Sequence, residues 1–563
     1  MDFRRQFFLV LRVRFLTADL QFPWRTGNLL VSLLVLSPLF ALLWLATTST
    51  HSNMVLQNIG WYLGNTLLLL IGVGIVTLSI GIVCGYLIAH YTFPLSRQLS
   101  WALLLPLALP GYIAAYIYTD LLAYAGPVQS FLRGWFGFTS PQDYWFPAIR
   151  SLPGAALIMG LVLYPYVYLL LRSTLLEQSL DVERTARSLG MSPLTVARKV
   201  HLPLARPALI AGAALAMLEA VGDFGTVDYF AIATLLTGMY DIWQTLSDIG
   251  GAARLALMLT CTALIVLMAE RYSRRQRRYY HSDQQVGTRN DTASSVSRQK
   301  PLTGWRGWLA CILCALPVAF GFLIPVGNLL HYAVQYFSES FSPLLLAHLL
   351  NSLKLALSTV AVTLLFGILV VYTQRWRREN IYQYTRVLCS LGYATPGAVL
   401  AIGIVVVSTG VDKVLNQVAS VFSSADVGLL LSGSLAALVL ALSIRFIIIC
   451  AGALEASLGN ITTSTDMAAR SLGHSTTQIL FKFHMPLLRR GVIAAALIIF
   501  VDTMKELPAT LILRPFNFDT LATHIYFLAD DEQIELAALG GLAIIVPSAI
   551  AMLLVYWVGK KGE

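Results

Sequence analysis

Apolar segments of about 20 residues recur along the whole chain, and this is the length that an α-helix needs to cross a bilayer. Only 12% of the residues are charged, against about 25% in soluble domains, so the chain is suited to lipid. We expect an all-α polytopic membrane protein. The sequence predicts twelve spans, at 29–46, 62–89, 101–123, 153–171, 208–231, 253–269, 308–333, 350–373, 387–408, 428–449, 491–511 and 536–558.

The Lys and Arg residues are distributed unevenly among the segments that connect these spans. Short cytoplasmic loops of membrane proteins carry an excess of such residues. With the N-terminus inside, the cytoplasmic segments hold 31 of the 39 Lys and Arg residues, and the external segments hold four. The net charge of +10 therefore reflects topology and not nucleic-acid binding. Both termini are expected in the cytoplasm, and the first span is expected to be retained, because no cleavage site follows it.

All six cysteines lie in or at the edges of apolar spans, so no disulfide framework is expected. Cys311 and Cys314 are one helical turn apart, but no second pair of ligands lies near them in the sequence. Packing inside a membrane-embedded helix accounts for both. No stable metal site and no cofactor are expected in this chain.

An internal repeat divides the sequence into two halves. Eight residues recur 283 positions later in one ungapped register: Ala186-Arg187-Ser188-Leu189-Gly190, Lys199, His201 and Pro203 return as Ala469-Arg470-Ser471-Leu472-Gly473, Lys482, His484 and Pro486. Upstream, Asn65 and Pro110-Gly111 match Asn351 and Pro396-Gly397 at an offset of 286. Such matches predict two parallel repeats of six spans each. The halves are residues 1–270 and 308–563, and the polar segment 271–307 is a cytoplasmic linker.

Two long polar loops, 173–207 and 450–490, share one pattern. Each has a helical stretch ending at Leu-Gly, a short polar turn, a second helical stretch and a proline. Gly190 and Gly473 suit the left-handed conformation that ends a helix. Plain solvated connections would not need to keep the same spacing in both copies. The pattern therefore favours two helix-turn-helix elements with a shared partner.

These loops resemble the signature loop of permeases in binding-protein-dependent ABC importers, Glu-Ala-Ala, three residues, Gly, nine residues, Ile, one residue and Leu-Pro. The matching positions are Ala186, Gly190 and Pro203 in the first loop and Ala469, Gly473 and Pro486 in the second. The signature glutamate is absent, but an acidic residue stands one position earlier in each loop, Glu183 and Asp466.

The resemblance implies the type I importer fold and a location in the bacterial cytoplasmic (inner) membrane. It also implies that each loop docks on an ABC ATPase subunit, that the ATPase is a dimer and binds ATP and Mg, and that an extracytoplasmic binding protein delivers the substrate. This chain has no Gly-x-x-x-x-Gly-Lys-Ser/Thr loop of its own, so it is expected not to be an enzyme.

Fused chains of this length are similar to ferric-iron permeases, and the segments 219–227 and 504–518 carry this similarity. Thiamine, phosphonate, sulfate and polyamine permeases share the architecture, so the substrate stays open among them. An ion-coupled secondary transporter is a further alternative. Such a transporter does not need two matched helical loops on its cytoplasmic face.

Four acidic residues follow the loops at the same offset: Glu219 and Asp223, then Asp502 and Glu506. The spacing of each pair, i and i+4, predicts that both carboxylates share one helical face. Acidic groups within the membrane usually line a pathway or cavity, and carboxylates suit a hard cation. They are candidates for a translocation path. The alternative is that they cap broken helices or pair with Lys505.

Overall fold

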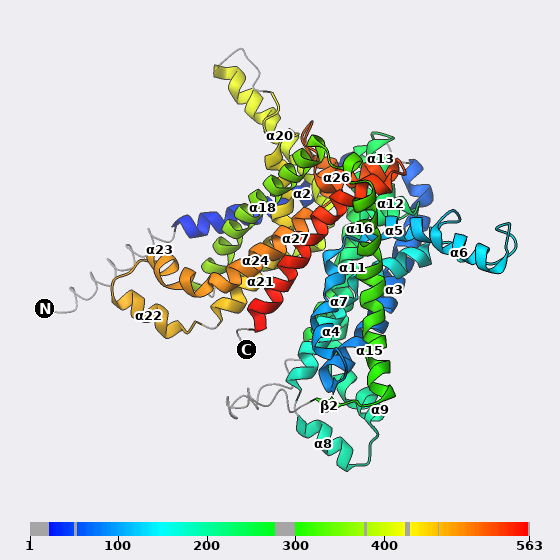
Figure 1. Ribbon diagram of the computed structural model, residues 1–563. Helices are drawn as coiled ribbons and strands as arrows, with labels where there is room; N and C mark the ends of the chain where they lie inside the picture. The colour runs from blue at the N-terminus through cyan, green and yellow to red at the C-terminus, as the bar shows by residue number, and fades with distance from the viewer. Residues whose placement is uncertain are drawn as a thin grey trace. The chain divides into compact units, whose positions relative to one another are not determined.

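The computed structural model describes residues 22–49, 53–178, 180–275, 299–376, 380–422, 428–459 and 461–560 (Figure 1). Most of these residues are helical, and one short parallel pair joins β1 (Tyr91–Thr92) to β2 (Lys300–Pro301). Nine helices in the described ranges are long and apolar enough to cross a membrane, and two bent pairs raise the number to as many as 11. The prediction of a helical, multi-spanning membrane protein is confirmed. Residues 276–298 of the predicted linker lie outside the described residues.

Contacts between helices divide the chain into two compact units. Unit 1 comprises residues 1–44, 352–504 and 512–517. Its elements are α2 (Phe22–Thr48), most of α18 (Pro343–Trp376), α19 (Asn380–Ala394), α20 (Gly397–Phe422), α21 (Leu435–Leu458), α22 (Thr463–Ser471), α23 (Thr476–Ile479), the π-helical turn η6 (Leu480–His484) and α24 (Met485–Met504). Helix α21 packs on both α19 and α24.

Unit 2 comprises residues 45–351, 505–511 and 518–563. In it α3, α7 and α11 run side by side and form much of the core (Figure 1). Its elements up to the linker are α3 (Asn53–His90), β1, α4 (Ser96–Ala102), η1 (Leu105–Ala108), α5 (Gly111–Leu122), α6 (Pro127–Phe136), α7 (Leu152–Glu177), α8 (Leu180–Ser188), α9 (Pro193–Val196), the π-helical turn η2 (Ala197–His201), α10 (Leu202–Leu204), α11 (Arg206–Gly222), α12 (Phe224–Tyr229), α13 (Leu235–Gln244) and α14 (Ile249–Arg275). β2 lies within the last part of the predicted linker, and α15 (Trp305–Val318) begins there. Then come η5 (Ala319–Leu323), α16 (Ile324–Gln335), α17 (Phe337–Ser340), α26 (Leu521–Asp530) and α27 (Ile534–Lys560), while α25 (Pro508–Leu513) is divided between the units.

Unit 1 consists mainly of residues from the second half of the sequence but contains the first span of the first half. Unit 2 contains most of the first half and also the first span of the second half. Helix α2 packs in unit 1, where Gly403 of α20 leaves room for the backbone of Pro38. Helices α15 and α16 pack in unit 2, where the hydroxyl of Tyr118 donates a hydrogen bond to the carbonyl oxygen of Phe320. The compact units therefore do not coincide with the sequence halves 1–270 and 308–563, which remain a division of the sequence.

All twelve predicted spans overlap helices, but several of these helices are interrupted. The third predicted span is divided among α4, η1 and α5, and the ninth is divided between α19 and α20. A proline stands at the last break in each of these two spans: Pro110 precedes α5, and Pro396 precedes α20. A proline disfavours the helical conformation of the residue before it and cannot donate a backbone hydrogen bond. The same local chemistry therefore breaks the helix at matching positions.

Candidate functional site

Both polar loops fold as the predicted helix-turn-helix, and the turn after the first helix has the same geometry in each. The φ angle is +81° at Gly190 and +82° at Gly473, which confirms the left-handed conformation expected there. The amide after each glycine donates to the carbonyl of an alanine, Met191 to Ala186 and His474 to Ala469, both at 3.2 Å. These hydrogen bonds close the end of the helix, as a left-handed glycine cap does.

The second limb of each loop starts at a serine cap and ends in a π-helical turn. The hydroxyls of Ser192 and Ser475 each accept a hydrogen bond from the amide three residues later, at 3.3 Å. The turns η2 and η6 follow at the same offset of 283. Pro203 and Pro486 lie two residues after these turns. Because proline lacks an amide hydrogen, the regular i to i−4 pattern cannot continue through it, and a wider turn fits there.

In the first loop, Glu183 on α8 binds two basic residues. Its Oε1 forms an ion pair with Lys300 of β2 and another, at 3.3 Å, with Arg187. Burial disfavours the ionised form of Glu183, but the hydrogen bond and charge of Lys300 outweigh burial, so the pKa of this carboxyl lies below its ordinary value. The carboxylate thus ties α8 to β2, in the last part of the predicted linker.

In the second loop, Asp466 on α22 has a more buried set of partners. Its Oδ2 pairs with Nε of Arg375 at 2.8 Å, and its Oδ1 accepts a hydrogen bond from Nε2 of His484 at 2.7 Å. Arg375 also donates to the carbonyls of Leu458 and Ile461. Asp466 therefore fixes α22 to the end of α18 and to the second limb of its own loop. The prediction that Glu183 and Asp466 take part in contact with an ATPase stays a prediction.

A tyrosine supports the histidine of each loop. Tyr86 and Tyr372 are 286 residues apart. The hydroxyl oxygen of Tyr86 lies 3.4 Å from Nδ1 of His201, and the ring centroids of Tyr372 and His484 are 5.7 Å apart. The hydroxyl of Tyr372 also donates to the carbonyl of Thr476 at 2.8 Å. The sequence-based site did not include these tyrosines, although their offset, equal to that of Asn65 and Asn351, was a usable signal.

The acids of the first half do not share one helical face, so that prediction is wrong. Helix α11 ends at Gly222, and Asp223 is the N-cap of α12. Its Oδ1 accepts from the amide of Thr226 at 3.1 Å and its Oδ2 from the Thr226 hydroxyl at 2.7 Å. A Cβ atom at Gly111 would overlap this carboxylate, so glycine is required at the start of α5. Glu219 lies half-buried on α11, one turn before the break.

The same correction applies to the second half. Helix α24 ends at Met504, so Asp502 lies on α24 and Glu506 lies in the break before α25. Oε1 of the buried Glu506 accepts a hydrogen bond from the amide of Ala509 at 3.1 Å. Leu507 precedes Pro508 and is therefore biased away from helix, which explains why the helix stops here. The alternative prediction, that acids cap broken helices, is confirmed for Asp223 and Glu506.

Comparisons with known proteins agree with this architecture. Residues 78–278, which include the first polar loop, match the family of binding-protein-dependent transport system inner membrane components. The chain is 24% identical to the Fe(3+)-transport system permease protein FbpB 2 of Haemophilus influenzae, over 87% of this chain and 88% of that protein. It is 22% identical to the ferric transport system permease protein FbpB of Actinobacillus pleuropneumoniae, over 88% of this chain and 71% of that protein.

A shorter relative matches only part of the chain. The molybdenum transport system permease protein ModB of Escherichia coli is 29% identical over 34% of this chain and 83% of its own length. Together these similarities confirm the resemblance to permeases of binding-protein-dependent ABC importers, with ferric-iron permeases among them. Residues 78–278 therefore resemble a permease domain of this class, within a chain whose described residues form several helices long and apolar enough to cross a membrane.

Proposed function

We propose that this chain is the permease subunit of an ATP-driven, binding-protein-dependent importer that moves ferric iron into the cytoplasm. The observation that carries this proposal is the duplicated polar loop, with the same glycine turn and the same π-helical turn 283 residues apart. One docking surface for each subunit of an ATPase dimer explains why both copies keep this geometry. Similarity to ferric permeases across most of the chain supports the choice of iron.

The proposed topology has twelve spans in two parallel six-span repeats, the type I importer fold, with both termini in the cytoplasm. Matching contacts in the two halves support the repeat. The side-chain amide of Asn65 donates a hydrogen bond to the backbone carbonyl of Ala233 at 2.9 Å. The side-chain amide of Asn351 donates to the backbone carbonyl of Asp519 at 3.0 Å. Each acceptor residue precedes a threonine capping box, at the start of α13 and of α26.

In this proposal the ATPase binds ATP and Mg, and an extracytoplasmic binding protein delivers the substrate. Closure of the ATPase dimer moves the polar loops. The ion pair between Asp466 and Arg375 then passes the movement of α22 to α18, because a buried, hydrogen-bonded pair holds the two helices in one geometry. Gly190 and Gly473 are the coupling positions, at the exposed turns of the loops.

Glu219, Asp223, Asp502 and Glu506 form the candidate translocation path in this proposal. Asp223 and Glu506 cap broken helices through their carboxylate oxygens. Their ionisable groups therefore lie at the breaks between helices. Irregular backbone inside a membrane protein is tolerated where it is buried in protein or lines a cavity. Carboxylates at such a place favour a hard cation over an oxyanion.

A molybdate or sulfate importer is the second candidate, because ModB matches a third of the chain at higher identity than the ferric permeases do. The test is uptake of ferric iron, molybdate and sulfate, each measured separately, in a strain that lacks this chain and in the same strain after its restoration. We expect restored uptake of iron alone. Restored uptake of either oxyanion would contradict the iron proposal. If no uptake is restored and no ATPase copurifies with the chain, the importer proposal is contradicted.

A further inference from the structure

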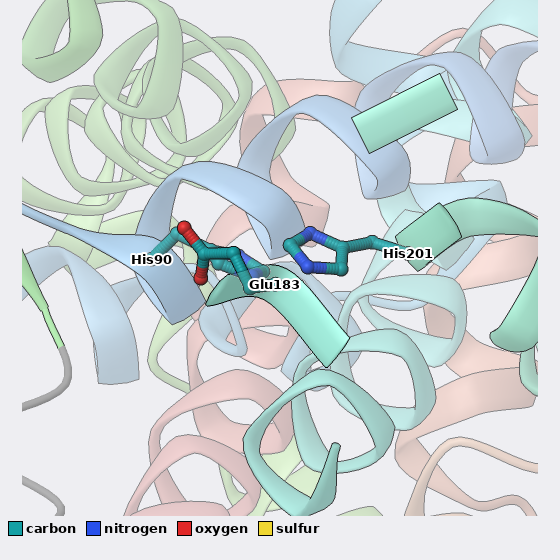
Figure 2. Close-up of side chains that lie close together, drawn as sticks. All are labelled: His90, Glu183 and His201. Carbon is teal, nitrogen blue, oxygen red and sulfur yellow. The ribbon is translucent and has the colours of Figure 1, made fainter. Parts of the chain in front are cut away.

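Three potential metal ligands from distant parts of the chain meet beside the first polar loop. His90 ends α3, Glu183 lies on α8, and His201 ends η2. One ligand atom from each residue lies within 4.8 Å of the others. Figure 2 shows the His201 ring directed toward the other two side chains, and the two imidazole rings stack with centroids 4.6 Å apart. The residues are too far apart in sequence to form a motif.

Tyr86 orients both imidazole rings. Nδ1 of His90 lies 3.3 Å from the Tyr86 carbonyl oxygen, and Nδ1 of His201 lies 3.4 Å from the Tyr86 hydroxyl. Histidine ligands of metal sites usually bind the metal through one nitrogen and an oxygen partner through the other. With Nδ1 of each ring directed to Tyr86, Nε2 is the nitrogen that each ring can offer to a metal.

Glu183 can offer one oxygen in the same way. The ion pairs with Lys300 and Arg187 both use Oε1, which leaves Oε2 for another partner. The Glu183 side chain is 15% exposed, and together with His90 and Lys300 it lines a small cavity. An ion can therefore reach the carboxylate from solvent, but it meets the positive charge of Lys300 there.

We propose that His90, Glu183 and His201 bind a divalent first-row transition-metal ion. Two imidazoles and one carboxylate suit ions such as Zn²⁺ or Fe²⁺, whereas Mg²⁺ and Ca²⁺ prefer sites built from oxygen ligands. The remaining coordination positions fall to water. This site is separate from the four acidic residues of the candidate translocation path, and it does not depend on which substrate the chain transports.

Lys300 competes with the metal for Glu183 in this proposal. Lys300 belongs to β2, which pairs with β1 directly after His90, so the ion pair holds the last part of the predicted linker against α8. Two positive charges near one carboxylate oppose each other. A bound metal ion therefore weakens the attachment of Lys300 to α8, and removal of the lysine charge should strengthen metal binding.

The second polar loop offers a built-in comparison. The position equivalent to His90 is Trp376, and the equivalent acid, Asp466, is bonded to Arg375 and His484. Among the described residues, the imidazole bonded to Asp466 is that of His484, and no second histidine takes the place of His90. We therefore expect one metal ion per chain and not two.

The test uses the full chain in lipid nanodiscs, purified with a tag that contains no histidine. Co²⁺ serves as an optical probe, and calorimetry with Zn²⁺ gives affinity and stoichiometry. Loss of an outer-shell partner of a metal site costs about 10–100-fold in affinity, so His90→Ala and His201→Ala should each weaken binding at least about 10-fold. His474→Ala, which alters a histidine of the second loop, should leave binding unchanged.

Lys300→Met separates loss of the site from loss of the fold, because we expect this variant to bind Co²⁺ and Zn²⁺ more tightly than the wild type. A misfolded variant would not gain affinity. The proposal is overturned if His90→Ala and His201→Ala retain wild-type affinity, if Lys300→Met does not bind more tightly, or if Mg²⁺ displaces Zn²⁺ at equal concentration.

Discussion

Asp466 accepts a hydrogen bond of 2.7 Å from Nε2 of His484 and so joins the two limbs of the second polar loop. The other oxygen of the same carboxylate binds Arg375 at 2.8 Å. The side chains of the acid and the arginine are only 7% and 12% exposed. In the first loop, by contrast, the partner of Glu183 is Lys300, whose side chain is 43% exposed. The two loops share a fold, but the basic partner of the carboxylate is far more exposed to solvent in the first loop than in the second.

This difference predicts unequal effects of removing the two acids. Asp466→Ala leaves the buried charge of Arg375 without its carboxylate, and breaking a buried pair in this way costs about 3–5 kcal/mol. Glu183→Ala should cost less, because solvent screens Lys300. Thermal unfolding of the two variants in nanodiscs measures the difference. Equal losses of stability would contradict the assignment of Asp466 as the stronger anchor.

Valine at the glycine turns should impair coupling. Gly190→Val and Gly473→Val each force a β-branched residue into the left-handed region, at a cost of about 1–2 kcal/mol. Apart from the adjoining residues of the chain, no atom of the described residues lies within 4 Å of a Cβ built at either position, so the effect arises from the backbone conformation. We expect normal membrane insertion with reduced uptake and reduced stimulation of ATP hydrolysis.

Gly452→Val is the matched control for these variants. This glycine lies in α21, also has open space around its Cβ position and has no positive φ angle. It should therefore retain more activity than either turn variant. Normal uptake by the double variant Gly190→Val with Gly473→Val would refute a coupling role for the two turns.

The capping acids allow charge to be separated from hydrogen bonding. Asp223→Asn with Glu506→Gln keeps an acceptor oxygen at each cap, whereas alanine at a cap typically costs about 1 kcal/mol. We expect the amide double variant to insert at normal levels and to lose ferric uptake, because the path no longer carries these two charges. Radiolabelled iron uptake, normalised to the amount of inserted protein, is the measurement. Wild-type uptake would leave Asp223 and Glu506 with capping as their role.

The proposed topology can be tested with reporter fusions. A reporter fused after Lys300 should be active as a cytoplasmic protein, and one fused between residues 338 and 342 should be active outside. The reason is the concentration of basic residues in the segments assigned to the cytoplasm. An external signal from the Lys300 fusion would contradict the topology.

Local features of the sequence predicted local features of the structure well. The apolar segments gave helices, the paired glycines gave left-handed turns, and the repeated spacing gave two loops of matching geometry. Pro110 and Pro396 likewise mark helix breaks that can be recognised without a structure. These features depend on backbone sterics and on hydrogen bonds within a few residues, so a short stretch of sequence contains the information that determines them.

The i, i+4 spacing of the acids was misleading because it assumed an unbroken helix. Asp223 meets Thr226, and Glu506 meets Ala509, only because the helix stops before each acid. The breaks could be suspected from Gly222 and Pro508. An acid at such a position caps the next helix only if the surrounding helices leave room for the chain to bend. Gly111 leaves this room for Asp223.

The sequence by itself determined that this is a multi-spanning helical protein with a duplicated polar loop, because hydrophobic length and local turn chemistry are properties of the chain. Only the tertiary structure decided that α2 packs in unit 1 and that α15 and α16 pack in unit 2. It also decided that Lys300 binds Glu183, that Arg375 binds Asp466, and that His90 and His201 meet. Such contacts join residues far apart in sequence, and the packing of whole helices, which no local pattern encodes, brings them together.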